Sequence, residues 1–492
     1  MENDKHQPAI IILGLGPGDP ALLTLRAADV LREAREIYLR TSHHPTAAGF
    51  PENLSVHSFD WIYEQEADYQ QVYQRIAEEV VSRAGEGGTV VYAVPGDPFI
   101  AEATPALILA LARERDLTVE VIPGVSFLEP TFSGLEVDPL PHTSVVDALE
   151  LTGAHYPTFP PDQPALIAQV YSRQVASDLK LTLMAVYPDD HPVRMVHEAG
   201  TNKLSIEELP LYQIDRSPQI GDRTSLYLPP LDPGSGMESF LEIIAHLRSP
   251  EGCPWDREQD HQTLRPNLLE ETYEALEAID ADDADAMQEE FGDLLLQIVL
   301  QSQIAAEYGE FTFSDVVRGI YFKLIQRHPH VFGDMELGEA DAVIKNWEKV
   351  KAQERLENGK SDKGSLGGVP GTLPALTQAE TYQKRAARLG FDWTDLAGVL
   401  AKLPEEVGEL QEALGKSRQA EEIGDLLFTV VNIARWMDVD AESALREANL
   451  RFKDRFTQME KEARAAGREL SEFTLEELDG LWENSKKEGK SE

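Results

Sequence analysis

The sequence has little cysteine and no long apolar run. Its 492 residues include one cysteine, Cys253, so no disulfide can form within the chain, which agrees with a reducing compartment. No run approaches the roughly 18 apolar residues of a membrane span. The first residues, MENDKHQPA, lack the basic and apolar segments of a secretory signal. We therefore expect a cytoplasmic location and no membrane partner.

Positive charge is also scarce. Lys and Arg total 44 against 87 Asp and Glu, which gives a formal net charge of −43. This excess argues against a protein that binds the phosphate backbone of nucleic acid. With 42% hydrophobic residues the chain can still bury sizeable cores, and its length favours about two to four domains.

The first part of the chain alternates short β-rich runs with helical patterns. Candidate helices cover 22–34 and 69–84, and candidate strands cover 9–13, 89–94, 119–122, 164–170 and 180–186. This alternation predicts an α/β fold with a largely parallel sheet. A Pro and Gly cluster at 229–236 then predicts a domain boundary.

After that boundary the pattern is helical throughout. Apolar residues recur at helical spacing in 268–279, 288–306 and 399–414, which predicts an all-α second part. A stretch rich in Gly, Ser and Lys at 357–374 reads as a linker. The expected domains are an α/β domain at 8–230 and two helical domains at 238–356 and 375–492.

An internal repeat of paired acids carries the chemistry. Its first copy has Glu271 and Glu274, then Glu290 and Asp293; its second copy has Glu406 and Glu409, then Glu422 and Asp425. A spacing of three puts both acids of a pair on one helix face, where like charges repel. One such pair is usually a solvated surface, but two pairs in each of two copies predict a cation between them. Ligation by oxygen alone favours Mg²⁺ or Mn²⁺.

Cationic and aromatic residues recur in step with the acids. Each copy has a cationic pair and a Trp-x-x-x-Lys segment: Lys323, Arg327, Trp347 and Lys351 in the first, and Arg451, Arg455, Trp482 and Lys486 in the second. A spacing of four lets each cationic pair hold phosphate oxygens, and each Trp can stack on a base. The combination predicts a site for a nucleoside triphosphate.

These residues resemble a known family. GCPWDREQ (252–259), the acid pairs, RHPHVFGD (327–334) and NWEKVKAQER (346–355) look like the MazG-type nucleoside triphosphate pyrophosphohydrolases. The resemblance implies Mg²⁺-dependent hydrolysis to the monophosphate and pyrophosphate, in an all-α fold that forms a homodimer. It also implies a metal role for the acids of both copies, with Lys402, Arg451, Arg455, Trp482 and Lys486 near the nucleotide. Asn267 takes the place of Lys402 in the first copy, so we expect the second copy to dominate turnover.

Glycine loops mark the α/β part. GLGPGDPALLTLRA (14–27) contains Gly14, Gly16, Gly18 and Asp19, and its spacing does not meet the dinucleotide-binding fingerprint. With VPGDPFIAEATP (94–105) and VEVIPGVSFL (119–128) it resembles the tetrapyrrole methylase family, which binds S-adenosylmethionine between two α/β subdomains. The resemblance implies that the 14–19 loop lines the cleft and that Gly96, Asp97 and Pro98 face the methyl donor. Joined to the helical part, the domain is similar to the YabN-like fusion proteins.

Three functions therefore compete. The first is a nucleoside triphosphate pyrophosphohydrolase with an appended methylase-like domain. The second is a methyltransferase acting on a tetrapyrrole, with the helical part as a regulatory nucleotide-binding module. The third is a scaffold without catalysis. The hydrolase needs no protein nucleophile, so Cys253 is expected to be structural or incidental.

Overall fold

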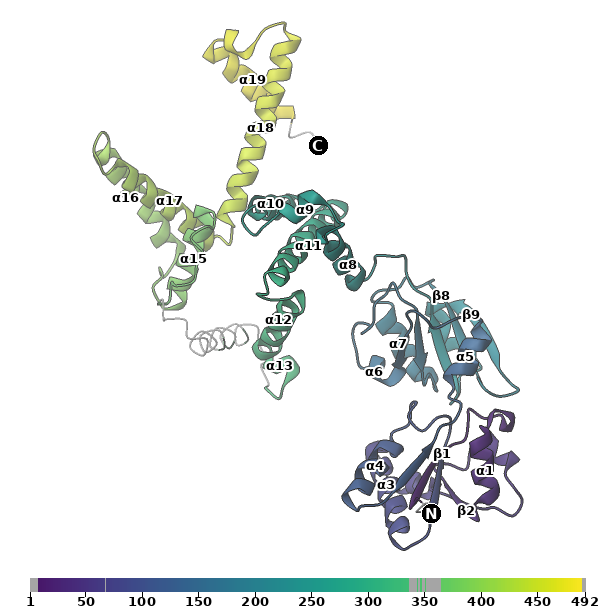
Figure 1. Ribbon diagram of the computed structural model, residues 1–492. Coiled ribbons are helices and arrows are strands. Elements are labelled where there is room, and N and C mark those ends of the chain that lie inside the picture. Colours follow the sequence, from purple (N-terminus) through teal and green to yellow (C-terminus); the bar gives the residue numbers. More distant parts are fainter. Residues whose placement is uncertain are drawn as a thin grey trace. The chain divides into compact units, whose positions relative to one another are not determined.

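The computed structural model describes residues 8–66, 68–335, 343, 346, 350 and 364–488 (Figure 1). Two compact units divide the chain, Met1–Phe313 and Ser314–Glu492. This division differs from the three domain ranges expected from the sequence, which stay predictions. Of the predicted linker, 364–374 consists of turns and loops, and 357–363 lies outside the described residues.

The first sheet of the α/β part is wholly parallel. Its strands are β1 (Ile10–Gly14), β2 (Glu36–Leu39), β3 (Ser55–Ser58), β4 (Val90–Val94) and β5 (Val119–Ile122), in the order β3-β2-β4-β1-β5. The helices around it are α1 (Leu25–Glu33), α2 (Asp60–Gln65), α3 (Tyr69–Gly85) and α4 (Thr104–Glu114). Helix α5 (Leu128–Leu135) packs instead on the second sheet, where Phe132 and Leu135 share a core with Leu166, Val196 and Tyr227 (Figure 1). Alternate residues of β4 enter separate cores, Tyr92 on one face and Ala93 on the other. Burial on both faces explains the uninterrupted apolar runs of the central strands.

The second sheet is mixed. It contains β6 (Ser144–Asp147), β7 (Ala165–Ala168), β8 (Pro192–His197), β9 (Ser205–Pro210) and β10 (Thr224–Leu228), in the order β6-β7-β10-β8-β9. Only β6 and β7 pair in parallel; β10 runs antiparallel to β7 and β8, and β8 to β9. The two sheets confirm the predicted α/β fold, whereas parallel pairing dominates only the first.

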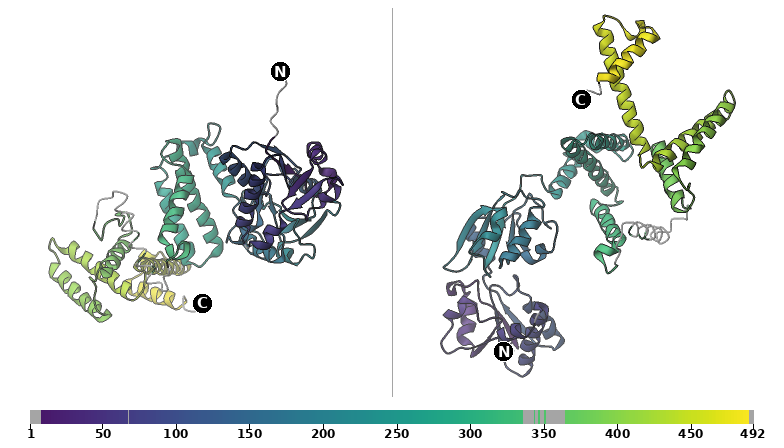
Figure 2. Two further views of the ribbon diagram at one scale, coloured as in Figure 1. Left: turned by 90° about the horizontal axis from the view of Figure 1, so that it is seen from below. Right: turned by 180° about the vertical axis from the view of Figure 1, so that it is seen from behind.

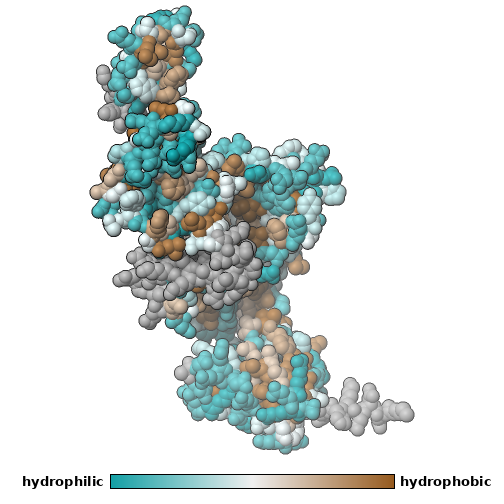
Figure 3. Space-filling model, turned by 90° about the vertical axis from the view of Figure 1, so that its left-hand side faces the viewer, coloured by the Kyte–Doolittle hydropathy of each residue, from teal (hydrophilic) through white to brown (hydrophobic). Residues whose placement is uncertain are grey.

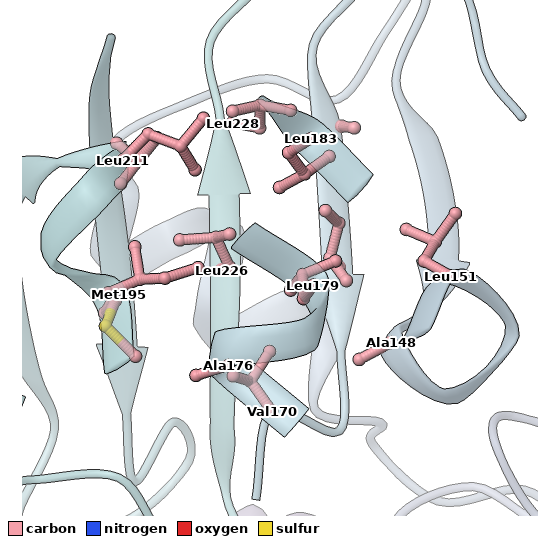
Figure 4. Close-up of a cluster of buried hydrophobic side chains, with 14 of the residues drawn as sticks. Ala148, Leu151, Val170, Ala176, Leu179, Leu183, Met195, Leu211, Leu226 and Leu228 are labelled. Atoms are coloured by element: carbon pink, nitrogen blue, oxygen red, sulfur yellow. The ribbon is translucent and has the colours of Figure 1, made fainter. Parts of the chain in front are cut away.

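One predicted strand is wrong. Residues 180–183 form the end of helix α7 (Arg173–Leu183), which is preceded by α6 (Ala148–Thr152). Val175, Leu179 and Leu183 are spaced by four and lie in the core against Leu226 of β10 (Figure 4). Residues 180–186, KLTLMAV, look like an alternating strand only because this segment contains the last member of the helical stripe, Leu183. The earlier members, Val175 and Leu179, precede the segment.

The helical part of the first unit follows the predicted boundary. Strand β10 ends at Leu228 and α8 (Met237–Arg248) begins directly after the Pro and Gly cluster, followed by α9 (Pro254–Glu258), α10 (Arg265–Asp280) and α11 (Ala284–Glu307). A separate core contains Ile244, Leu264 and Ile304. The confirmed change from α/β to all-α therefore comes with a change of core.

The second unit is helical over its described residues. It holds most of α12 (Phe313–Arg327), then α13 (Pro329–Phe332), α15 (Ala375–Arg388), α16 (Leu396–Ala413), α17 (Gln419–Trp436), α18 (Ala441–Ala465) and α19 (Leu475–Glu488). Asp395 and Asp440 cap α16 and α18 by accepting hydrogen bonds from the backbone amides of Gly398 and Ser443. Helices α16 and α17 run side by side in every ribbon view (Figures 1 and 2). No helix within the described ranges is long and apolar enough to cross a membrane.

Candidate functional site

The second set of acids forms a cluster between α16 and α17. Glu406 and Glu409 lie one turn apart on α16, and Glu422 faces them from α17, so that one carboxylate oxygen of each lies within 4.8 Å of the others. Glu406 is 5% exposed and Glu422 is 2% exposed, whereas Glu409 is open to solvent. We call these three residues the second cluster. These three acids, which the sequence pattern predicts to share a site, therefore do lie close together.

Two oxygens of the second cluster lack hydrogen-bond partners. Oε2 of Glu406 and Oε2 of Glu422 are both buried with no donor in reach among the described residues. A buried carboxylate oxygen without a partner costs free energy unless a donor or a cation compensates it. The arrangement therefore suits an oxygen-ligated divalent cation.

Two cations contact the second cluster from its outer side. Lys402 places Nζ 3.1 Å from Oε1 of Glu406 and 2.9 Å from Oε1 of Glu405, and these hydrogen bonds raise the pKa of the lysine. Arg418 donates from Nη2 to Oε1 of Glu422 at 2.6 Å. The sequence motifs predict Lys402 at this site but do not predict Arg418. The signal was present, because Arg418 precedes Glu422 by four residues.

The fourth acid of the second copy, Asp425, is not one of the three grouped oxygens. It is exposed on α17, yet its charge acts on the same site. Burial raises the pKa of Glu422, the neighbouring Arg418 opposes that shift, and the charges of Glu409 and Asp425 add to it. Asp425 therefore contributes negative potential at the second cluster, and its role as a metal ligand stays a prediction.

The first set of acids forms a similar cluster between α10 and α11. Glu271 and Glu274 on α10 and Glu290 on α11 each offer an oxygen within 4.8 Å of the others; we call them the first cluster. Burial and the charges of Asp293, Glu274 and Glu290 raise the pKa of Glu271. Burial, Glu274, Glu289 and Asp293 do the same for Glu290. Across the described part of the chain, no Lys or Arg pairs with this cluster.

The predicted clamp of the second copy is partly assembled. The Arg455 guanidinium lies 5.6 Å from the centre of the Trp482 ring, and Nζ of Lys486 lies 5.9 Å from it. Trp482 also packs against Phe452, with ring centres 5.3 Å apart, beside an apolar groove lined by Phe456 and Leu475. Arg451 is exposed and pairs with Glu447 at 3.1 Å. Figures 1 and 2 show α19, which carries Trp482 and Lys486, apart from α16 and α17, which carry the second cluster.

The corresponding residues of the first copy are only partly described. Lys323 and Arg327 both lie on α12, Lys323 exposed and Arg327 half-buried. They belong to the second unit, whereas the first cluster belongs to the first unit. Trp347 and Lys351 lie outside the described residues. Whether this set meets the first cluster therefore stays a prediction.

The glycine loops of the α/β part meet at the carboxyl edge of the first sheet. A Cβ atom at Gly14 would lie 2.5 Å from the backbone nitrogen of Gly124 and 2.7 Å from the carbonyl oxygen of Gly96. Gly16 and Gly96 exchange two backbone hydrogen bonds at 3.2 and 2.7 Å, and both have positive φ. These glycines allow three backbone segments to approach one another closely.

The two loop aspartates fix the loops themselves. Asp19 accepts a hydrogen bond from the amide of Ala21, Gly18 is buried beside it and Pro98 is buried after Asp97. Asp97 accepts from the amides of Phe99 and Gly124. Phe99 is 52% exposed at this edge. The loops therefore present backbone and an apolar side chain to a ligand, while both carboxylates are already engaged.

An ion pair that the sequence motifs do not predict lies at the same edge. Arg40 directly follows β2 and places Nη1 3.1 Å from Oε2 of Glu102, in the loop after β4. The Glu102 side chain is 3% exposed and also accepts from Thr104. A charged residue immediately after a buried strand was the available signal.

Two family models match the chain. The model of the Tetrapyrrole (Corrin/Porphyrin) Methylases matches residues 9–215. The model of the MazG nucleotide pyrophosphohydrolase domain matches 259–332 and 395–459, which contain the first and second clusters respectively. The two matches correspond to the α/β and helical parts of the fold.

Relatives cover both the full chain and its helical half. The uncharacterized protein YabN of Bacillus subtilis (strain 168) is 39% identical over 486 residues, 97% of this chain and 98% of that protein. The nucleoside triphosphate pyrophosphohydrolase/pyrophosphatase MazG of Thermotoga maritima is 47% identical over 249 residues, 51% of this chain and 95% of that protein. The nucleoside triphosphate pyrophosphohydrolase of Escherichia coli (strain K12) is 42% identical over 258 residues, 51% of this chain and 97% of that protein.

Proposed function

The chain belongs to the MazG nucleotide pyrophosphohydrolase family, with a tetrapyrrole methylase domain before it, and we propose that it hydrolyses nucleoside triphosphates to monophosphates and pyrophosphate. The observation that carries the proposal is the second cluster, in which two buried carboxylates each keep an oxygen without a partner. Three of the four acids that the sequence pairs in this copy, Glu406, Glu409 and Glu422, each offer an oxygen within 4.8 Å of the others.

The cation in this proposal is Mg²⁺ or Mn²⁺. In each copy the donor set consists of carboxylate oxygens from two adjacent helices, the set that hard divalent cations prefer. Glu406, Glu409 and Glu422 would hold the ion in the second copy and Glu271, Glu274 and Glu290 in the first, with Asp425 and Asp293 beside them. When bound, such an ion neutralises charge on phosphate oxygens and favours formation of hydroxide from water.

The other side chains bind and orient the triphosphate. Lys402, which stays protonated beside Glu406, offers a positive charge next to the cluster. Arg451 and Arg455 supply fixed donors for phosphate oxygens. The Trp482 ring can stack on a base, with Lys486 beside it. An acid of the cluster accepts the proton of the attacking water, and no covalent enzyme intermediate is needed.

Two copies of this chain complete the site in our proposal. Helix α19, which carries Trp482 and Lys486 of the clamp, lies apart from α16 and α17 within one chain (Figures 1 and 2). Exposed apolar side chains on α17 provide a self-association face; they include Ile423, Leu427, Phe428 and Val430. Figure 3 shows hydrophobic patches among the hydrophilic surface of the chain. Burying this face against a second copy is favourable. We therefore propose a homodimer through the helical part.

A second activity is proposed for the α/β part. The match to the tetrapyrrole methylases favours S-adenosylmethionine as a ligand and a tetrapyrrole-like methyl acceptor. The backbone of the Gly96 loop and the exposed Phe99 are available to such a ligand. Calorimetric titration of the full chain with S-adenosylhomocysteine, compared with a Gly96→Val variant, tests binding without requiring the acceptor. Absence of binding would leave this part with a structural role.

The hydrolase is tested directly. Purified chain is incubated with Mg²⁺ and a panel of nucleoside triphosphates, and monophosphate and pyrophosphate are quantified. We expect equal amounts of both products, no turnover in excess chelator, and recovery on adding Mn²⁺. Binding of triphosphate without turnover would favour the alternative in which the helical part regulates a methyltransferase. Formation of a nucleoside diphosphate and inorganic phosphate would contradict the proposed reaction.

A further inference from the structure

Arg418 contacts the second cluster at the acid that is least accessible to solvent. Its side chain is 69% exposed, while that of Glu422 is 3% exposed. The guanidinium therefore reaches from solvent to one oxygen of a buried carboxylate, Oε1, at 2.6 Å. The other oxygen, Oε2, has no partner and belongs to a carboxylate that approaches Glu406 and Glu409.

The first copy lacks this arrangement. Aligning Glu290 with Glu422 puts Ala286 at the position of Arg418, and aligning Glu271 with Glu406 puts Asn267 at the position of Lys402. Within the described residues the first cluster has no basic partner. The two copies thus share their acids and differ in the charges that oppose a bound cation.

From this difference we propose that Arg418 is a displaceable counter-ion that weakens binding of a divalent cation to the second cluster in the absence of nucleotide. The inference rests on the proposed metal role of the cluster. Without a cation, the guanidinium offsets the repulsion among three close carboxylates. When a cation binds, two positive charges compete for Glu422, and Arg418 withdraws into the solvent that already surrounds most of it.

The exposure of Arg418 is what makes displacement feasible. A buried arginine would need a new partner inside the protein, whereas an exposed guanidinium regains water at little cost. A triphosphate that carries the cation would offer the released guanidinium a phosphate oxygen instead. The second copy would then bind its metal ion together with the triphosphate. The first copy would bind the ion without nucleotide.

The test measures binding of Mn²⁺ to the full chain without nucleotide. A Glu271→Gln, Glu274→Gln background removes two proposed ligands of the first cluster, so that the measured binding of Mn²⁺ reports on the second cluster. Calorimetry then compares this parent with Arg418→Ala, which reproduces Ala286, and with Arg418→Lys, which keeps the charge. Arg464→Ala is the matched control, since it removes an exposed arginine that is 4.0 Å from Glu460, also four residues away.

We expect Arg418→Ala to bind Mn²⁺ about tenfold more tightly than the parent, equivalent to ~1.4 kcal/mol. Arg418→Lys should stay within about threefold of the parent, because its charge still opposes the ion. Arg464→Ala should leave affinity unchanged. Arg418→Gln serves as a second neutral variant if α17 is disturbed by alanine at its amino-terminal end.

The outcomes separate this inference from the proposed function. Unchanged or weaker binding in both folded neutral variants overturns the inference alone, since the parent still binds the ion. Absence of Mn²⁺ binding in the parent and in the unmodified chain overturns both the inference and the metal site. A lysine variant that binds as tightly as the alanine variant would show that charge is not the cause, and would also overturn the inference.

Discussion

The guanidinium of Arg418 donates a hydrogen bond to the buried carboxylate of Glu422 at 2.6 Å, one helical turn along α17. The contact lies at the edge of a cluster whose two buried acids each keep an oxygen without a partner. The largely exposed Arg418 therefore binds a carboxylate, that of Glu422, which also belongs to a site suited to a metal cation. The first cluster has equivalent acids and no such partner in the residues described.

Substitution of one acid in each copy should separate their contributions. We expect Glu409→Gln to reduce the rate of triphosphate hydrolysis on the order of 100-fold, and the matched Glu274→Gln to leave most of it. The reason is Lys402, which lies 3.1 Å from Glu406 in the second copy, where the first copy has Asn267. Initial rates at saturating Mg²⁺ measure both effects. The reverse ranking would show that the first copy carries the activity.

The stabilising effect of Mg²⁺ should increase with pH. The pKa values of Glu271, Glu290 and Glu422 are raised by burial, so without metal the folded chain loses stability as the pH rises through these values and the acids ionise. A bound cation favours the ionised form and reverses that loss. The Mg²⁺-induced rise in melting temperature should be larger at pH 7 than at pH 5, as measured by calorimetry. An equal rise at both values would place the cation elsewhere.

The aromatic group on α19 should govern nucleotide affinity. Replacing Trp482 by Ala removes the ring next to Arg455 and Lys486, and loss of a base-stacking surface typically raises KM about tenfold or more. Trp482→Phe retains an aromatic face and should restore most of the affinity. Steady-state kinetics with one triphosphate provide the comparison. A fall in kcat at constant KM would instead indicate a role in positioning the reacting phosphate.

The glycine contact in the α/β part should be intolerant of a side chain. A Cβ at Gly124 would overlap the carbonyl oxygen of Gly96, whereas one at Gly153 would meet nothing within 4 Å. We expect Gly124→Ala to destabilise this part by about 1–3 kcal/mol. Gly153→Ala, at a helix end with φ −94, should be nearly neutral. Thermal unfolding measures both, and equal midpoints would mean that the loops can separate without cost.

His44 should resist protonation. Burial, together with the charges of Arg223 and Arg40, lowers its pKa to about 4, and its Nδ1 has no partner among the described residues. The unfolded chain takes up this proton near pH 6.5, so the group contributes stability above that pH, up to about 3 kcal/mol, which is lost as the pH falls towards 4. A labelled histidine resonance titrating near pH 4 and absent from His44→Gln would verify the shift. Titration near pH 6.5 would contradict it.

Much of the helical site could be predicted because its information is local. The spacing of Glu406 and Glu409 puts both on one face of whatever helix they form. Glu422 follows after a short segment that leaves room for a turn and the start of a second helix. The same logic failed for residues 180–183, where a short window hid the helical stripe of α7. It also could not tell the exposed Asp425 from the buried Glu422 three residues before it.

The sequence by itself determined the change from α/β to helical architecture, the two copies of the acid pairs and the family, since each depends on residue type at fixed spacing. Only the tertiary structure decided which acids lose water, that Arg418 pairs with one of them, and that Gly14, Gly96 and Gly124 meet. The physical reason is that periodicity fixes the face of an element, whereas burial and partners depend on what packs there. For Glu422 that neighbour is α16, which the fold places against α17.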